Sequence, residues 1–192
     1  MTSMTVNKLS FLKKASIITI GLAVAVFGVF TVYAASQVSR EYHLKGAFLR
    51  YVAQFVEWPA DSIPESAVNI CVYGEIPALK GINSINGRIV NDRSIVIRTI
   101  PKYDIAKKEC QILYISKYAK DDLDALIADM KGLPVLTFGD MDGFAEKGGA
   151  MNFHVVNNRM AIVINQQTIN DSKLKISPRM LKLVTVVPNI DG

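Results

Sequence analysis

The side chains best suited to acid–base chemistry, or to binding a small ligand, follow three short apolar runs. The runs are residues 68–73, 111–115 and 134–138, and the residues at their ends include Gly74, Glu75, Ser116, Lys117 and Asp140. Carboxylate, hydroxyl and ammonium groups are those used in proton transfer. If the runs are neighbouring parallel strands, these residues share one rim at the carboxyl ends of the strands, where α/β sheets bind ligands. The alternative is a set of ordinary polar loops, which are usual at strand ends.

Sequence patterns typical of enzymes are missing elsewhere in the chain. There is no G-x-S-x-G nucleophile motif, and Gly74 does not begin the glycine series that binds dinucleotides. The two histidines, His43 and His154, are widely separated and give little support to a metal site. Both are interpreted as half-buried structural histidines. We therefore expect a protein that is not an enzyme and that uses no metal or cofactor.

The apolar pattern predicts the strands that carry this rim. Strands are expected over the three apolar runs and on both sides of a turn within residues 88–100, with a helix over residues 121–130. The three runs show no apolar–polar alternation and are separated by helices. They therefore indicate parallel strands that are covered on both faces.

The C-terminal part of the chain follows a different pattern. Residues 150–156 and 159–164 flank Asn157-Asn158 and predict an antiparallel hairpin. Ser177 with Pro178 begins a last helix that carries Met180, Leu181, Leu183 and Val184. The predicted fold class is α/β, with a mixed, largely parallel central sheet flanked by helices, a C-terminal antiparallel hairpin and a terminal helix.

A helix is also predicted before the first strand, from a cap at Ser39 to about Glu57, because Pro59 disfavours further helical geometry. Its predicted apolar stripe contains Leu44, Ala47, Phe48, Tyr51, Val52, Phe55 and Val56, and its predicted polar face contains Arg40, Lys45, Arg50 and Gln54. Trp58 follows Phe55 by three positions and extends the stripe. The indole either packs in the core or, if exposed, belongs to a partner surface.

The N-terminal segment predicts export. Residues 15–35 carry no charge, and the lysines that precede them hold the N-terminus in the cytoplasm. Small residues at the end of the run favour signal-peptide cleavage after Ala34, whereas the length of the run also permits an uncleaved membrane anchor. We expect residues 1–34 to be this leader and residues 35–192 to form a single periplasmic domain.

Export bears on the expected partners and on the two cysteines. The formal net charge of +5 includes the leader lysines, and no basic run interleaved with aromatic residues follows, so nucleic acid is not an expected partner. In an oxidising compartment, an even pair such as Cys71 and Cys110 is more often bridged than free. The alternative is two buried thiols that pack as small apolar residues.

Five segments together resemble the YfiR family of bacterial periplasmic proteins. They are KGAFLRYVAQFVEWP, NICVYGE, ECQILYIS, GLPVLTFGDMDGFAEKGGAMNF and INQQTINDSKLKISPRMLKLV, and their order and spacing match over residues 40–187. The resemblance implies an exported regulator whose best-known relative represses an inner-membrane diguanylate cyclase, YfiN, and is opposed by an outer-membrane lipoprotein, YfiB. It also implies that Cys71 and Cys110 match a family disulfide. A second cysteine pair found in some members is absent here, which puts redox control through that pair in doubt.

The expected function is therefore a non-catalytic periplasmic regulator that binds and represses a membrane diguanylate cyclase and so lowers cyclic-di-GMP signalling. The expected partners are a YfiN-like cyclase, a YfiB-like lipoprotein and a second copy of the chain. The alternative is a periplasmic small-ligand sensor or binding module that uses the rim. An inward-facing Glu75 or Lys117 in a pocket at the rim favours the alternative, whereas an apolar patch away from the rim favours a protein partner.

Overall fold

The computed structural model of the protein describes residues 36–119, 123–156 and 159–187. The chain divides into two compact units, Met1–Glu41 and Tyr42–Gly192, and the second contains the described strands. The predicted leader, residues 1–34, lies outside the described residues, as does its cleavage after Ala34. Among the residues that are described, no helix is both long enough and apolar enough to span a membrane.

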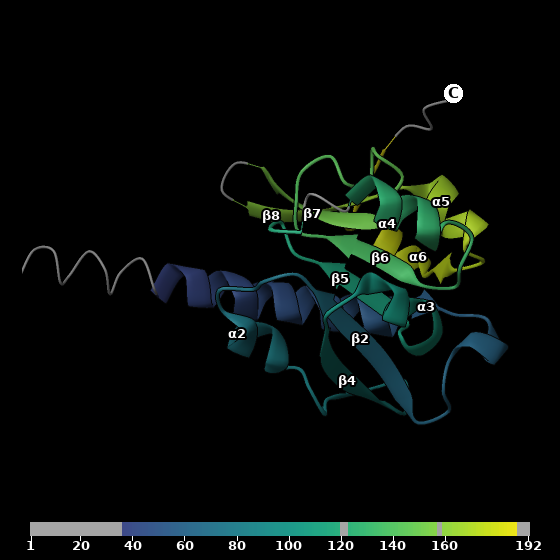
Figure 1. Ribbon diagram of the computed structural model, residues 1–192, viewed down its shortest axis with the longest axis horizontal. Coiled ribbons are helices and arrows are strands. Elements are labelled where there is room, and N and C mark those ends of the chain that lie inside the picture. Colours follow the sequence, from purple (N-terminus) through teal and green to yellow (C-terminus); the bar gives the residue numbers. More distant parts are fainter. Residues whose placement is uncertain (1–35, 120–122, 157–158, 188–192) are drawn as a thin grey trace, which may run out of the picture. The chain divides into compact units, whose positions relative to one another are not determined.

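An eight-stranded mixed sheet forms the centre of the second unit (Figure 1). Its strands lie in the order β10-β8-β7-β6-β5-β2-β4-β3. The neighbours from β4 through β2, β5 and β6 to β7 are parallel, whereas β8 runs antiparallel to β7 and β3 runs antiparallel to β4. The strand bounds are β2 Ala67–Tyr73, β3 Ile89–Val90, β4 Arg93–Ile100, β5 Ile112–Ile115, β6 Leu136–Gly139, β7 Met151–Val156, β8 Arg159–Ile164 and β10 Thr185–Val186.

Helices and a small second ribbon complete the second unit. Residues 36–55 are helical, and residues 42–55 of this first helix belong to the unit. The other helices are α2 Leu79–Asn83, α3 Ala106–Glu109, α4 Leu123–Met130, α5 Gln166–Asp171 and α6 Pro178–Leu181, with single 3-10 turns η1 Ala60–Ser62 and η2 Tyr103–Ile105. The ribbon pairs β1 Val56–Glu57 antiparallel with β9 Lys175–Ile176.

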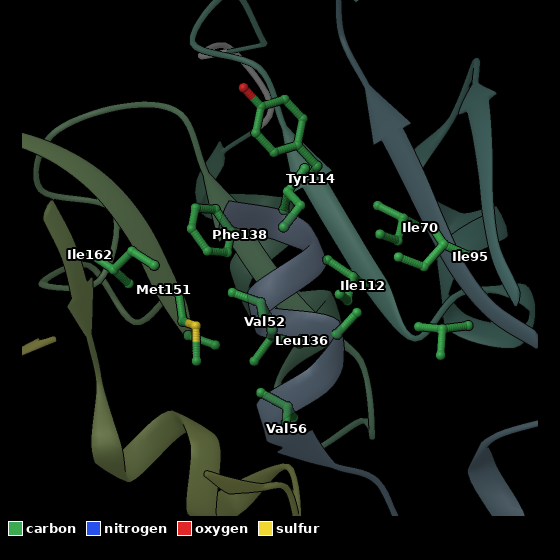
Figure 2. Packing of buried hydrophobic residues seen from close by; sticks show 14 of the residues in the cluster. Val52, Val56, Ile70, Ile95, Ile112, Tyr114, Leu136, Phe138, Met151 and Ile162 are labelled. Atoms are coloured by element: carbon green, nitrogen blue, oxygen red, sulfur yellow. The ribbon is translucent and has the colours of Figure 1, made fainter. Parts of the chain in front are cut away.

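Apolar residues on both faces of the sheet explain why the central strands read as continuous apolar runs. In β5, Ile112 and Tyr114 join a core cluster with Leu49 and Val52 of the first helix. The alternate residues of β5 join a second cluster with Leu126 of α4. Figure 2 shows the first of these clusters, in which Val52 points towards the side chains of the strands. Each face of the central strands is therefore closed by its own helices.

The predicted fold class and strand positions are confirmed. The three apolar runs form β2, β5 and β6, which are adjacent and parallel. Residues 88–100 form the antiparallel pair of β3 and β4, and the turn residues Asn91 and Asp92 have positive φ angles of 47° and 62°. The hairpin of β7 and β8 also forms, although its predicted turn at Asn157-Asn158 lies outside the described residues. Ser177 caps α6 by accepting a hydrogen bond from the Arg179 amide.

The predicted bounds of the first helix are wrong. The chain is already helical at residue 36, so Ser39 lies inside the helix and does not cap it. The helix ends at residue 55, two residues before the predicted end, because Val56 and Glu57 pair with Ile176 and Lys175 in a ribbon. This pairing joins segments that are distant in the sequence, and a local pattern does not report it.

The predicted polar face of the first helix is right at Arg40, Arg50 and Gln54, which are exposed, but it is wrong at Lys45, and the predicted apolar stripe is partly wrong. Lys45, which was assigned to that face, is buried, and Leu44 and Tyr51 of the predicted apolar stripe are exposed. The buried face instead contains Tyr42, Lys45, Gly46, Leu49, Val52 and Ala53. The buried face is rotated about the helix axis from the predicted stripe by roughly 100°, which is the angle between successive residues of a helix. The same rotation leaves His43 exposed, whereas it was expected to be half-buried.

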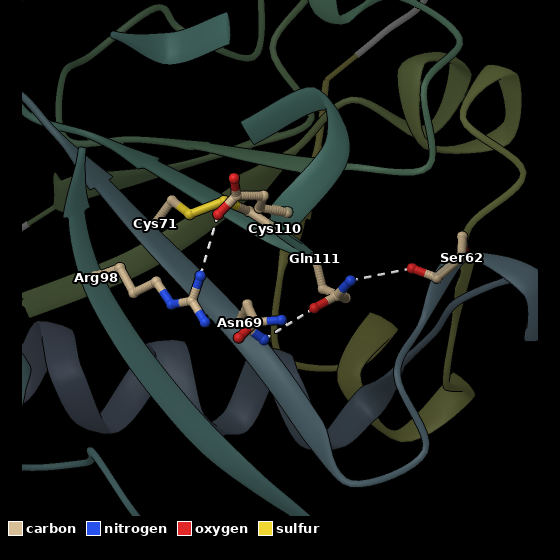
Figure 3. The surroundings of a disulfide bond; sticks show 7 residues. Ser62, Asn69, Cys71, Arg98, Cys110 and Gln111 are labelled. Carbon is tan, nitrogen blue, oxygen red and sulfur yellow. Dashed lines mark hydrogen bonds and ion pairs between the residues drawn. A yellow bond between two sulfur atoms is a disulfide. The ribbon is translucent and has the colours of Figure 1, made fainter. Parts of the chain in front are cut away.

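A disulfide joins Cys71 of β2 to Cys110, which lies between α3 and β5 (Figure 3). Both sulfur-bearing residues are buried in the cluster between the sheet and α4. At the surface beside them, Arg98 of β4 forms an ion pair with Glu109 at 3.1 Å. The bond therefore links two neighbouring strands inside a core, which gives it a structural role.

Removal of the disulfide is expected to destabilise the fold. The bridge closes a loop with a sequence separation of 39 residues, for which chain-entropy loss in the unfolded state contributes about 4 kcal/mol as an upper estimate. A Cys71→Ala, Cys110→Ala variant should lose up to this amount of unfolding free energy, measured by urea denaturation. The wild type with reductant should lose a similar amount. An unchanged urea midpoint in both cases would contradict a stabilising bridge.

Candidate functional site

The predicted rim forms at the carboxyl ends of β2, β5 and β6. Backbone hydrogen bonds continue past the strand ends, from Ser116 N to Tyr73 O at 2.9 Å and from Asp140 N to Ile115 O at 2.8 Å. The hydroxyl of Ser116 donates to the carbonyl of Glu75 at 2.5 Å and accepts a bond from the Tyr118 amide at 3.2 Å. The structure therefore brings Ser116 and Asp140 to one edge, and both are buried there.

Asp140 forms a buried ion pair with Lys45 of the first helix. The Lys45 Nζ lies 2.6 Å from Asp140 Oδ1, and the two side chains are only 3% and 5% exposed. The same ammonium group lies 4.5 Å from the centre of the Tyr42 ring, close enough for a cation–π contact. The pair fastens the helix to the end of β6. Sequence reasoning placed Asp140 at the rim and missed its partner, because Lys45 was assigned to solvent.

The other predicted rim residues lie closer to the surface. Glu75 is exposed, and the Lys117 ammonium group lies 5.4 Å from the centre of the Tyr118 ring. A shallow pocket of ≈ 370 Å³ lies beside the rim and is lined by Tyr73, Gly74, Thr99, Ile100, Pro101, Tyr118 and Ala119. Neither Glu75 nor Lys117 lines this pocket. The acid–base groups of the predicted rim therefore do not converge on it.

Gly74 is fixed by the packing of the rim. Its φ angle is +87°, a left-handed value that side chains rarely adopt. A methyl group added at this position would lie 2.9 Å from the Ala119 Cβ and 3.1 Å from the Ser116 Cβ. The glycine permits the close approach of two loops, its own after β2 and residues 116–119 after β5, and so has a structural reason independent of any ligand.

Trp58 is half-buried and packs against the core beside the first helix. Its indole N–H donates to the carbonyl of Gln111 at 3.1 Å. The Gln111 side chain in turn donates to Ser62 O at 3.0 Å and accepts a bond from Asn69 N at 2.9 Å (Figure 3). Trp58 thus belongs to a network that ties the segment before β2 to the start of β5, and part of its ring remains exposed.

His154 of β7 is half-exposed and pairs with Asp142 at 2.6 Å. This pair lies on the surface, and Asp142 provides its only carboxylate. Within the described residues, no group of three or more His, Cys, Asp or Glu side chains is placed to hold a metal ion.

The GFAEKGGAMNF segment is closed by hydrogen bonds. The Ala145 amide donates to Asn152 Oδ1 at 3.1 Å, and the Asn165 side chain donates to Ala145 O at 2.9 Å. Asn152 is buried, so its amide satisfies a backbone group that water does not reach. Within this segment, polar contacts therefore hold the loop between β6 and β7 in place.

Among the described residues, the large apolar side chain with the greatest fractional exposure lies near the C-terminal end. Leu183 is 74% exposed, and Leu181 and Val186 are also exposed. Val184, between them, packs against the core instead. The exposed residues lie in α6, in β10 and in the turn that joins them, and β10 is an edge strand of the described sheet. We call Leu181, Leu183 and Val186 the β10-edge patch, and sequence reasoning missed it because it assigned Leu183 to a helix.

A small charged cluster joins η2 and α3 to α4. Lys107 Nζ lies 2.9 Å from Asp129 Oδ2 and 3.3 Å from Asp104 Oδ1. The hydrogen bond from Lys107 lowers the pKa of the Asp129 carboxyl, and the same bond raises the pKa of Lys107. Loss of water around the Tyr103 ring raises the pKa of its hydroxyl, and the Asp129 charge adds to this effect.

The fold and these surfaces define a class of small α/β domain whose polar rim is closed by internal contacts and whose sheet edge presents apolar side chains. The chain belongs to the YfiR/HmsC-like family, whose sequence profile matches residues 42–185. This confirms the resemblance seen in the sequence. The family is periplasmic, regulatory and non-catalytic, and its members act in cyclic-di-GMP signalling with signalling partners.

Other comparisons add the fold alone. No curated protein sequence matches the chain significantly. A solved structure described as a conserved domain protein from Vibrio cholerae O1 biovar El Tor str. N16961 is similar, with a TM-score of 0.51 and 12% sequence identity. The match covers 74% of this chain and 60% of that chain, so it spans less than two thirds of the Vibrio protein.

Breaking the Lys45–Asp140 pair is expected to cost much of the stability of the domain. Lys45→Met leaves a buried carboxylate without its cation, for which about 3–5 kcal/mol is typical. The double variant Lys45→Met, Asp140→Asn removes both charges and should lose less than the sum of the two single variants. Urea denaturation of the four proteins measures this coupling. Arg98→Met, at an exposed pair, is the control and should cost less than about 1 kcal/mol. Additive losses would contradict direct coupling.

The Lys107–Asp129 contact is expected to matter only above acidic pH. The folded-state pKa of Asp129 is lowered, so its contribution is present above the unfolded value of about 4 and is lost as the pH falls through the folded value. Asp129→Asn should therefore be slightly less stable than the wild type at pH 7, and this gap should shrink towards pH 2. The gap in urea midpoint is measured at both pH values, and a gap of constant size would contradict the assignment. Lys107→Met should reproduce the effect.

Proposed function

We propose that the protein is a non-catalytic periplasmic regulator that binds and represses a membrane diguanylate cyclase. Its proposed effect is to lower the cellular level of cyclic-di-GMP. Membership of the YfiR/HmsC-like family carries this proposal, because the family is regulatory and acts in this signalling system. The proposed partner is the periplasmic part of a YfiN-like cyclase, and residues 35–192 are the proposed exported domain after a leader at residues 1–34.

The β10-edge patch is the proposed contact surface. Binding free energy at protein interfaces is concentrated in a few apolar or aromatic residues at a desolvated centre. Leu183, at 74% exposure, offers such a side chain beside an edge strand. The two residues of β10 pair with β8, and among the described residues no strand pairs with their other side, which suits the addition of a partner strand. Trp58 remains a second proposed contact, since part of its ring is exposed.

Repression by such a contact is a shift between two states of the partner. The regulator lowers cyclase output only if it binds the inactive form more tightly than the active form. A shift from a 1:99 to a 99:1 ratio needs about 5.5 kcal/mol of differential binding. A few well-packed side chains supply this amount. A YfiB-like lipoprotein that covers the same surface would relieve repression by competition, and a second copy of the chain is a further proposed partner.

A small-ligand sensor is the second candidate function. The pocket of ≈ 370 Å³ lies at the carboxyl ends of the parallel strands β2 and β4 and is lined in part by Tyr73 and Tyr118. Ligands bind at such strand ends in many α/β folds. Of the proposed rim residues Gly74, Glu75, Ser116, Lys117 and Asp140, only Gly74 lines the pocket.

The repressor proposal predicts a rise in cyclic-di-GMP when the gene is deleted. The wild type should reverse the rise, whereas Leu183→Asp at equal protein level should not, because a carboxylate would be desolvated in the apolar contact. Loss of a central contact of about 2 kcal/mol weakens binding roughly 30-fold. Cyclic-di-GMP is measured by mass spectrometry of cell extracts.

Ile89→Asp is the matched control for Leu183→Asp. Ile89 is a 60% exposed aliphatic residue of β3, at the other end of the sheet order, and its variant should restore repression. Unchanged cyclic-di-GMP on deletion would reject the repressor proposal. Full repression by Leu183→Asp would remove the β10-edge patch as the contact. If Tyr118→Ala fails to restore repression while Leu183→Asp restores it, the result would favour a sensor that uses the pocket.

A further inference from the structure

A second groove lies between the first helix and the segment that follows α2. Its volume is ≈ 420 Å³, within the range of small-ligand sites. The helix contributes one stripe with i, i+3, i+4 and i+7 spacing, formed by Ala47, Arg50, Tyr51 and Gln54. The opposite wall consists of Ser84, Ile85 and Arg88. None of these residues belongs to the rim or to the β10-edge patch.

The two walls are held together by close backbone contacts. A methyl group at Gly46 would lie 2.9 Å from Gly81 O, and one at Gly81 would lie 2.7 Å from His43 N. Gly46 and Gly81 therefore let the first helix and α2 make close contact. Each glycine lies within three residues of a residue that lines the groove. At the far end of the helix, the Asn91 side chain donates to Gln54 O at 2.9 Å. These contacts fix the spacing of the walls before any ligand arrives.

The charge of the groove is unbalanced. Arg50 and Arg88 are both exposed, and across residues 36–119, 123–156 and 159–187 neither forms an ion pair with a carboxylate. No aspartate or glutamate is among the residues that line the groove. Arg98 is different, because it is paired with Glu109. Two arginines therefore line one groove whose lining contains no acidic residue.

Arginine in this arrangement is suited to a doubly charged anion. The planar guanidinium group binds carboxylate or phosphate oxygens through two parallel hydrogen bonds, which adds geometric specificity to the charge. Two such groups match the charge of a dicarboxylate or a phosphate. The Tyr51 ring, which stacks on Phe55 with ring centres 5.7 Å apart, gives the groove a firm aromatic wall. A single negative charge would leave one arginine unpaired.

We propose that this groove binds a small dianion, a dicarboxylate or an organic phosphate, through Arg50 and Arg88. The site goes beyond the proposed repressor function, because it gives the domain an input that is separate from the β10-edge patch. An acidic segment of a protein partner is the competing occupant, and it is an outcome of the test.

Isothermal titration calorimetry of the full chain at low ionic strength tests the proposal, since salt screens exposed charges. The probes are succinate and glycerol phosphate, with succinamide as the neutral control and acetate as the singly charged control. At least one dianion should bind, and succinamide and acetate should bind at least tenfold more weakly. Tighter binding of succinate would identify the ligand class as a dicarboxylate. Tighter binding of glycerol phosphate would identify it as an organic phosphate.

Arg50→Gln and Arg88→Gln should each weaken dianion binding by about tenfold or more, because each removes a charge-assisted hydrogen-bonding group. Arg179→Gln, at an exposed arginine of α6 outside the groove, is the matched control and should bind like the wild type. Thermal melts confirm that the variants fold, as expected for exposed positions. No dianion binding, or equal loss in Arg179→Gln, would overturn the proposal. Binding of a glutamate-rich peptide without binding of either dianion would assign the groove to a protein partner.

Discussion

Burial of the central strands on both faces is the constraint on which the rest of the structure depends. β2, β5 and β6 are parallel neighbours, and alternate residues of β2 and β5 enter two different core clusters. Such strands are stable only when helices exclude water from both sides of the sheet. The first helix must therefore dock on one face and α4 on the other. The Lys45–Asp140 pair fastens the first helix to the sheet, and the disulfide ties β2 to the segment that leads into β5.

The parts of the fold that could be predicted from the sequence are those with a local signal. An apolar run without alternation indicates a covered strand, and this placed β2, β5 and β6 correctly. The Asn91-Asp92 pair tolerates positive φ angles, and the structure uses both of them in a hairpin turn. Ser177 before Pro178 marked the start of α6, since the hydroxyl caps the helix and the proline fits its first position. In each case the physical cause lies within a few residues.

The candidate site was less predictable, because its contacts join distant segments. Lysine is normally a surface residue, and the charge of Asp140, which lies at the end of β6, offsets the cost of burying Lys45. Phe48, Tyr51 and Phe55, at i, i+3 and i+7 spacing, lie on one face of the helix, so periodicity alone favoured a face that the fold leaves partly exposed. β10 is two residues long and exists through pairing with β8. The exposure of Leu183 follows from this pairing and from the inward turn of Val184.

The first helix connects the surfaces that the structure offers. Lys45 fastens its buried side to β6, and Arg50, little more than one turn later, lines the groove on another side. An anion bound by Arg50 and Arg88 would contact the same helix that the Lys45–Asp140 ion pair attaches to the end of β6. Two sites influence each other only if a ligand binds two states of the protein with different affinity. Besides the ion pair, buried residues such as Leu49 and Val52 attach this helix to the sheet, so a second state would have to move them together. Coupling between the groove and the distant β10 edge would therefore pass through Lys45 and the strands that lie between them.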